Sequence, residues 1–154
     1  GLIRASSAET ELALRRAAKV GAIKYRPGDN CFSICEGSEI NDAQRKGLDA
    51  LQKRVEILDG TGVVSLLSNV VFNRLNRIVA YPVQDESKWI DGEGRILPDA
   101  LLVKQGATAK DLAYAVHTDL GDGFIRATDA RTGRVIGADH ELSDNDVVKI
   151  HAKT

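Results

Sequence analysis

The two cysteines are the residues best suited to metal or redox chemistry. Cys31 and Cys35 lie four positions apart, the chain has no other cysteine, and no histidine is close enough in sequence to complete a four-ligand zinc site. An iron–sulfur cluster would also require four ligands, so a ferredoxin is not expected. We therefore expect two reduced thiols, as in a cytoplasmic protein, and no metal ion.

The histidines and acidic residues form no catalytic pattern either. His117, His140 and His151 are far apart in the sequence, with no cysteine or serine nucleophile beside them. The segment Asp139-His140-Glu141 lacks the glycine of a calcium loop. We expect His117 at the end of a helix, where a cation interacts favourably with the helix dipole. No catalytic residue is predicted.

Motifs for nucleotide hydrolysis are missing. No segment matches G-x-x-x-x-G-K-S/T, and Gly60-Thr61-Gly62 lacks the lysine that a phosphate-binding loop needs. The sequence has no Asn-Lys-x-Asp base-reading motif. It also contains no methionine, so we expect it to be a piece of a longer protein. Hydrolysis by this chain alone is not expected.

The net charge of −1 conceals two different halves. Residues 1–77 carry 12 Lys and Arg against 9 Asp and Glu, whereas residues 78–154 carry 9 against 13. Hydrophobic periodicity changes at the same place, which predicts two domains, 1–77 and 78–154. No apolar run approaches the roughly 20 residues of a membrane span, so no membrane partner is expected.

The first half has helical spacing. We predict a helix that begins with a capping box in Ser6-Ser7-Ala8-Glu9 and ends at Gly21. A short strand is predicted at CFSI, and a second helix from Asn41 to the Gly60-Thr61-Gly62 segment. Residues 63–75 form an apolar helical segment, and we expect one broad face of it to be buried.

The second half has the spacing of strands around one helix. We predict a hairpin of residues 78–83, with Pro82 near an edge or end, and residues 95–104, interrupted by Pro98. The helix is capped by Thr108 and Asp111 and closed by Gly121. Further strands are predicted at residues 124–128, 135–136 and 147–152. The fold class is α+β, with the last strand parallel to the first in a β-grasp arrangement.

Three segments of the second half carry a family resemblance. They are PDALLVKQGATAKDLAYAVHTDLG, DARTGR and DNDVVKI, within residues 81–150. They resemble a TGS domain, the ubiquitin-like β-grasp module of threonyl-tRNA synthetases, stringent-response enzymes and certain GTPases, and in particular the archaeal OBG-like, YchF-type GTPases. The C-terminal residues are not the diglycine of a sulfur carrier or modifier.

The first half is similar to the same GTPases. SSAETELALRRAAKVG resembles their Ser-Ala motif and the last helix of the G domain, and GTGVVSLLSNVVFNRL resembles the helical connector to the TGS domain. This disfavours a synthetase or a stringent-response enzyme. The resemblance implies that the backbone at Ser7 and Ala8 is part of a nucleotide-base site, completed only in the intact protein, where GTP or ATP would bind with Mg²⁺.

The family's TGS domains are associated with RNA and the ribosome. Because residues 78–154 have a net charge of −4, an RNA site would have to be a local basic patch. Trp89 could stack on a base, or it could pack on a neighbouring domain. The candidate residues are Lys88, Trp89, Arg126, Arg131, Arg134 and Lys149. A second basic surface comprises Arg15, Arg16, Lys19, Arg45, Lys46, Lys53 and Arg54.

A protein-interaction role remains the alternative. The acidic module could bind a protein partner, or it could dock on its own G domain as a regulatory lid, and its charge suits this as well as it suits RNA binding. DNA binding is not expected.

Overall fold

The computed structural model describes residues 3–97 and 99–153 and divides the chain into two units. The division lies between Val70 and Val71, inside the helix η1 (Asn69–Arg74). The sequence-based boundary is at 77/78 because charge and periodicity change where the first strand of the second unit begins. Each unit is described by itself below.

In the first unit, helix α1 (Ala8–Lys19) begins one residue later than its predicted cap. Ser7 is the N-cap, and its side chain accepts a hydrogen bond from the amide of Thr10. The predicted serine cap is thus confirmed at Ser7, but among the described residues Glu9 makes no return hydrogen bond, so the capping box is not complete. The side chain of Thr10 contacts that of Ser7 instead, at 2.8 Å.

Helix α2 (Asp42–Leu58) begins as predicted. Asn41 and Gln44 form a capping box, which satisfies amides at the helix N-terminus in both directions. Two short strands, β1 (Ile23–Lys24) and β2 (Ser33–Ile34), pair in antiparallel orientation. β2 lies within the predicted CFSI strand, whereas β1 is too short to produce a pattern. The buried apolar core of this unit consists of Leu14, Ile23, Leu48 and Val55.

The predicted burial of residues 63–75 is wrong. Residues 63–74 form α3 (Val63–Ser68) and η1, in which no residue is buried. Leu67 and Leu75 are 59% and 57% exposed. The periodicity marks an apolar face correctly, and the side chains on it are not buried within either unit.

By length and composition, the helical stretch Asp42–Arg74 is apolar enough to cross a membrane. The stretch is interrupted, however, because Asp59, Gly60 and Gly62 have positive φ angles of 51°, 102° and 76°. The helix after this interruption, Val63–Arg74, is roughly 18 Å long at 1.5 Å per residue, shorter than the roughly 30 Å hydrocarbon core of a bilayer.

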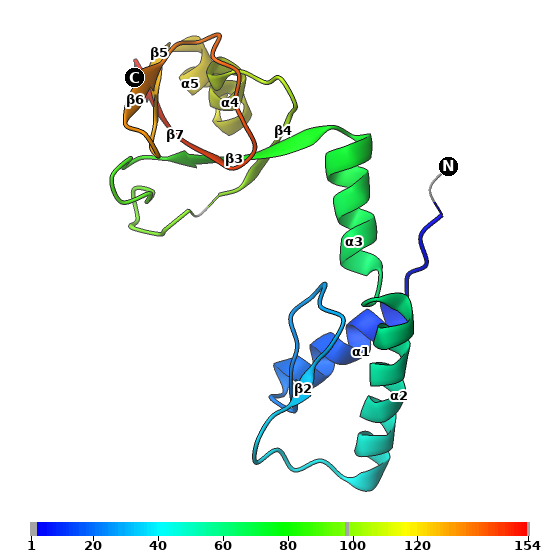
Figure 1. The fold of residues 1–154 in the computed structure, drawn as a ribbon. Helices are drawn as coiled ribbons and strands as arrows, with labels where there is room; N and C mark the ends of the chain where they lie inside the picture. The colour runs from blue at the N-terminus through cyan, green and yellow to red at the C-terminus, as the bar shows by residue number, and fades with distance from the viewer. Residues whose placement is uncertain (1–2, 98, 154) are drawn as a thin grey trace. The chain divides into compact units, whose positions relative to one another are not determined.

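The second unit is a five-stranded sheet in the order β4-β3-β7-β5-β6 (Figure 1). The parallel pairing of the first and last strands, β3 and β7, confirms the predicted β-grasp arrangement. Helix α4 (Ala109–Val116) packs on one face through Ala109 and Leu112, both 0% exposed. The strands are β3 (Arg77–Val83), β4 (Leu101–Lys104), β5 (Phe124–Asp129), β6 (Arg134–Ile136) and β7 (Asp146–Ala152).

Pro82 lies in the part of β3 that extends beyond its pairing with β4. Pairing with β4 ends at Ala80. The carbonyl of Val79 accepts from the Asn145 amide on the β7 side. Because backbone groups alternate, the nitrogen of Pro82 faces the β4 side, beyond the end of β4. No ladder hydrogen bond is lost, and the predicted position near a strand end is confirmed.

Two boundaries in this unit differ from the prediction. The strand expected over residues 95–104 is limited to β4, and Pro98 lies outside the described residues. Helix α4 ends at Val116 rather than at Gly121, and a second helix, α5 (Thr118–Asp122), follows. The predicted strand at the end of the chain is confirmed as β7.

His117 joins these two helices, and its predicted place at a helix end is confirmed, because it is the C-cap of α4. Its Nδ1 accepts a hydrogen bond from the Asp119 amide at 3.2 Å, so it serves as the N-cap of α5. The sequence does not reveal this role because α5 has only five residues.

Candidate functional site

In the first unit, Ser7 and Ala8 lie at the N-terminus of α1. The Ser7 amide donates to the carbonyl of Thr61 at 2.8 Å, and the Ser7 side chain caps the helix. Among the described residues, the amides of Ala8 and Glu9 have no hydrogen-bond acceptor. First-turn amides are the donors that a helix leaves for an external acceptor. The arrangement thus offers backbone donors but no nucleophile or base.

The connection between α2 and α3 fixes the segment that precedes α1. Gly62 has φ +76°, and a Cβ built on it would lie 2.1 Å from the Ala5 carbonyl oxygen and 2.9 Å from the Ser6 Cα. Only a glycine allows the two backbones to approach so closely. The position of Ser7 therefore depends on Gly62 as well as on Thr61.

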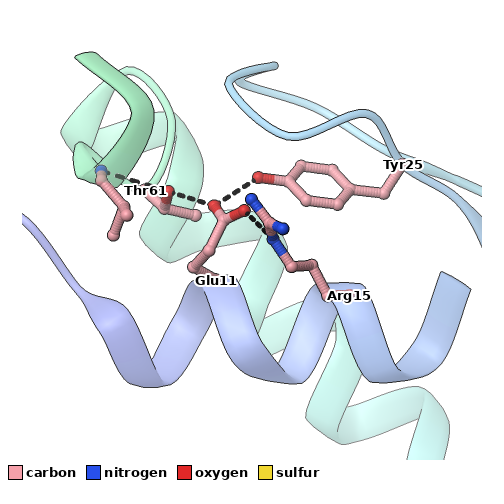
Figure 2. Close-up of polar contacts among 5 residues, drawn as sticks. Glu11, Arg15, Tyr25 and Thr61 are labelled. Atoms are coloured by element: carbon pink, nitrogen blue, oxygen red, sulfur yellow. Dashed lines mark hydrogen bonds and ion pairs between the residues drawn. The ribbon is translucent and has the colours of Figure 1, made fainter. Parts of the chain in front are cut away.

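A buried carboxylate connects the same elements, as Figure 2 shows. Glu11 is on α1, and its side chain is 7% exposed. Thr61 and Tyr25 donate their hydroxyl protons to Oε2 of Glu11 at 2.5 and 2.8 Å. Arg15 donates from Nε to Oε1 at 2.6 Å. Arg15, which the sequence assigns to a basic surface, is therefore paired with a carboxylate.

The network shifts the titration of both of its acids. Burial raises the pKa of Glu11, but the hydrogen bonds from Thr61, Arg15 and Tyr25 and the charge of Arg15 outweigh it, and the pKa lies below its ordinary value. Burial, followed by the hydrogen bond to Glu11 and its charge, raises the pKa of Tyr25. Glu11 is thus held as a carboxylate and Tyr25 as a neutral phenol. We call Glu11, Arg15, Tyr25 and Thr61 the Glu11 network.

Sequence reasoning misses the Glu11 network. Glu11 stands among ordinary surface-type residues of an amphipathic helix, and its partners Tyr25 and Thr61 are 14 and 50 positions away. One feature of the sequence sets Thr61 apart, because it lies between Gly60 and Gly62 in a segment that resembles a phosphate-binding loop but lacks its lysine.

In the second unit, Trp89 and Arg131 lie together. The Arg131 guanidinium carbon is 5.2 Å from the centroid of the indole ring. The indole nitrogen donates to the Ala130 carbonyl at 3.3 Å, and Arg131 donates from Nε and an Nη to the Asn145 carbonyl at 3.3 and 2.9 Å. These contacts attach the segment after β3 to the β5–β6 turn. One face of the indole is thus already occupied by a cation.

A second group lies on β5 and β7. Arg126 is the cross-strand partner of His151, and Thr128 is that of Lys149. The Thr128 hydroxyl is 2.9 Å from Nε2 of His151. Lys149 also forms an ion pair with Glu86, which follows β3. We call Glu86, Arg126, Thr128, Lys149 and His151 the His151 cluster.

The cluster favours a neutral imidazole. Burial lowers the pKa of His151, and the charges of Arg126 and Lys149 lower it further, whereas Glu86 acts in the opposite direction. The result is a pKa below the ordinary value of 6.5. His151 therefore loses its proton below the pH at which a solvent-exposed histidine does.

The contacts therefore divide the six predicted RNA-binding residues into two pairs and two single residues. The structure places Arg126 and Lys149 in the His151 cluster and pairs Trp89 with Arg131. Lys88 is exposed, and its amide donates to Asp85. Arg134 is exposed on β6, opposite Asp129 of β5. His151 and Thr128 were missed, although alternation along β5 and β7 could have placed them beside Arg126 and Lys149.

Metal ligands do not gather in either unit. Across residues 3–97 and 99–153, no group of three or more His, Cys, Asp or Glu side chains could hold an ion. Cys31 and Cys35 are present as free thiols.

Comparisons with known proteins agree with this two-part organisation. Residues 2–85 match the domain described as Obg-like GTPase YGR210-like, G4 motif-containing, and residues 94–152 match the TGS domain. The chain is similar to an uncharacterized GTP-binding protein of Methanocaldococcus jannaschii, with 48% identity over 94% of the chain and 36% of the relative.

The chain is also similar to a solved structure of a GTP binding protein. The crystal structure of a GTP binding protein from Pyrococcus horikoshii OT3 matches 96% of the chain and 36% of that protein, at 40% identity and a TM-score of 0.70. The chain thus spans about a third of the length of these two relatives.

Proposed function

Because the chain belongs to the Obg-like GTPase family, we propose that it joins one edge of a nucleotide site to a TGS module that docks on RNA or the ribosome. Both relatives described above are named as GTP-binding proteins. In the proposed protein, Ser7 and Ala8 contact the nucleotide base, and the second unit provides the docking surface.

The N-terminus of α1 supports the nucleotide role. The cap and the Thr61 carbonyl hold Ser7, while the Ala8 amide is available as a donor to a base oxygen. The Glu11 network holds α1 against the α2–α3 connection, so a shift of Ser7 would be transmitted to Thr61. Coupling of this kind requires that nucleotide binding favours one of two arrangements of these elements.

The phosphates and Mg²⁺ of GTP or ATP require residues that this chain does not contain. No phosphate-binding lysine motif is present in the sequence. We therefore propose that the chain alone neither holds nor hydrolyses the nucleotide, and that it acts in the cytoplasm as part of a longer protein. Titration calorimetry with GTP tests this. We expect no binding at micromolar concentrations, and a micromolar dissociation constant would refute the assignment of a partial site.

The RNA role depends on one observation, the two basic side chains of the His151 cluster on neighbouring strands. Co-sedimentation of the chain with ribosomes at low salt should detect docking. For two to four phosphate contacts on single-stranded RNA, the logarithm of the affinity should fall with that of the salt concentration at a slope of about −1.4 to −2.8. If the chain does not sediment with ribosomes, RNA docking is wrong.

A protein partner is the second candidate, and the acidic net charge of residues 78–154 favours it. Such a partner, including the protein's own G domain, would contact the module with little release of counterions. The same salt titration distinguishes the two roles, since a flat response favours protein contacts. Arg131 should be left intact in these tests because it holds Trp89 in place.

A further inference from the structure

The β-grasp sheet has one face that α4 does not cover. Ala127 and Val148 point toward α4, since both belong to the buried core. Side chains alternate along a strand, so Arg126 and Thr128 of β5 and Lys149 and His151 of β7 point to the opposite face. The hydrogen bond between Thr128 and His151 agrees with this placement.

The charges on this face come from three segments. β5 contributes Arg126, and β7 contributes Lys149 together with the titratable His151. The segment after β3 contributes the opposing charge, Glu86, which is paired with Lys149. The face is therefore locally positive by one charge when His151 is neutral and by two when it is protonated, in a domain whose net charge is negative.

We propose that this face is a phosphate-binding site for single-stranded RNA, in which Arg126 and Lys149 contact the backbone and His151 strengthens binding when it is protonated. The proposal rests on the RNA role proposed above and specifies its site. Thr128 orients the imidazole through Nε2, and its hydroxyl can either donate or accept, so the contact persists in both protonation states.

Charge and geometry favour a nucleic acid with separated phosphates. Two cations on adjacent strands, of which Lys149 is paired with Glu86, suit local contacts with a flexible strand better than the broad field needed for a duplex. A bound phosphate would offset the two cations that disfavour the imidazolium. The burial and positive charges that lower the pKa of His151 in the free chain thus leave room for an upward shift on binding.

The test measures RNA affinity as a function of pH. Fluorescence anisotropy of a labelled oligouridine of about 12 nucleotides, a length within the usual site sizes, reports binding to the full 154-residue chain. Between pH 7.5 and 5.5 we expect affinity to rise as the pH falls, by up to about tenfold per pH unit for one proton taken up. An affinity that is independent of pH would overturn the role of His151.

Variants identify the residues. His151→Gln should remove the pH dependence, so that the affinity no longer rises between pH 7.5 and 5.5, because glutamine takes up no proton there. Arg126→Ala with Lys149→Ala should weaken binding about tenfold or more. Glu86→Gln should tighten it, since Lys149 is released from its ion pair.

Arg134→Ala is the matched control. It removes one exposed positive charge from the same unit, but Arg134 pairs with Asp129, which alternates onto the α4 side of the sheet. A loss as large as that from Arg126→Ala would show that only net charge matters, and would overturn the site.

The remaining outcomes distinguish a failure of the proposed site from a failure of the proposed RNA role. RNA binding that persists in the Arg126/Lys149 double variant means that the site is elsewhere, while the RNA role stands. No binding by the wild-type chain at low salt refutes the RNA role itself. Equal affinity for an oligoglutamate of the same length would instead indicate an acidic protein partner. An NMR titration of the wild-type histidine with the same RNA requires no variant, and an unchanged His151 pKa would also contradict the proposal.

Discussion

Glu11 is the side chain on which the first unit's polar contacts converge. It accepts hydrogen bonds from Thr61, Tyr25 and Arg15, which come from different parts of the chain. A buried carboxylate with partners for both oxygens fixes the relative positions of the elements that carry them. Its sequence context gives no sign of this, since residues of the same type at exposed positions of α1 are chemically identical.

We expect Glu11→Gln to destabilise the chain by about 1–3 kcal/mol, because the amide nitrogen of glutamine cannot accept and so cannot replace both the oxygen that accepts from Arg15 and the oxygen that accepts from Thr61 and Tyr25. Chemical denaturation monitored by circular dichroism measures the change. The matched control is Glu9→Gln, an exposed first-turn residue of the same helix, whose effect should stay within about 0.5 kcal/mol. Equal losses in the two variants would mean that only helix-dipole charge matters.

The same residue predicts a pH dependence. Because the folded pKa of Glu11 is lowered, its stabilising contribution is complete above the ordinary value of 4.5 and is lost as the pH falls through the folded value. The raised pKa of Tyr25 acts at the other end, with stability lost as the pH rises above its ordinary value of 10.0. Denaturation midpoints across pH should show both losses. Glu11→Gln should lack the acid loss due to this residue, and an unchanged acid limb would contradict the assignment.

At the level of elements, caps determine where helices begin and glycines determine where segments meet. The boxes at Asn41 and Thr108 were predictable because both partners lie within one turn. The approach of Gly62 to Ala5 was not, because it joins segments that are distant in sequence. A positive φ alone does not distinguish such a glycine from one that only ends a helix.

Gly62→Ala and Gly21→Ala separate these two roles. Both glycines have nearly the same φ, +76° and +75°, but a Cβ at Gly21 meets nothing within 4 Å. Gly21→Ala should therefore cost only the left-handed conformation, roughly 1–2 kcal/mol. Gly62→Ala should cost a further 1–3 kcal/mol or so from the clash with the Ala5 carbonyl. Equal costs by thermal or chemical denaturation would contradict the backbone contact.

At the scale of the whole molecule, each unit has its own buried core. The apolar side chains of α3 belong to neither core. Leu14 belongs to the core of the first unit and is 0% exposed, whereas Leu67 on α3 is 59% exposed. The two relatives reported above are about three times as long as this chain.

The contrast is measurable in this chain. Leu14→Ala should cost about 2–5 kcal/mol because it leaves a cavity. Leu67→Ala should change stability by no more than about 0.5 kcal/mol, since its side chain is already in water. Denaturation of both variants under the same conditions provides the comparison. A cost of several kcal/mol for Leu67→Ala would show that the α3 face is buried in solution.

Whereas it missed the short elements β1 and α5, the sequence by itself determined the order of the longer helices and strands, the β-grasp fold of the second half and the family. These depend on periodicity, caps and short motifs, which are local and survive without knowledge of distant contacts. Tertiary structure alone decided that Glu11 is a buried carboxylate and that Arg126, Lys149 and His151 share the sheet face opposite α4. Each of these depends on which segments meet across tens of residues, and neither side-chain type nor spacing along one element encodes that.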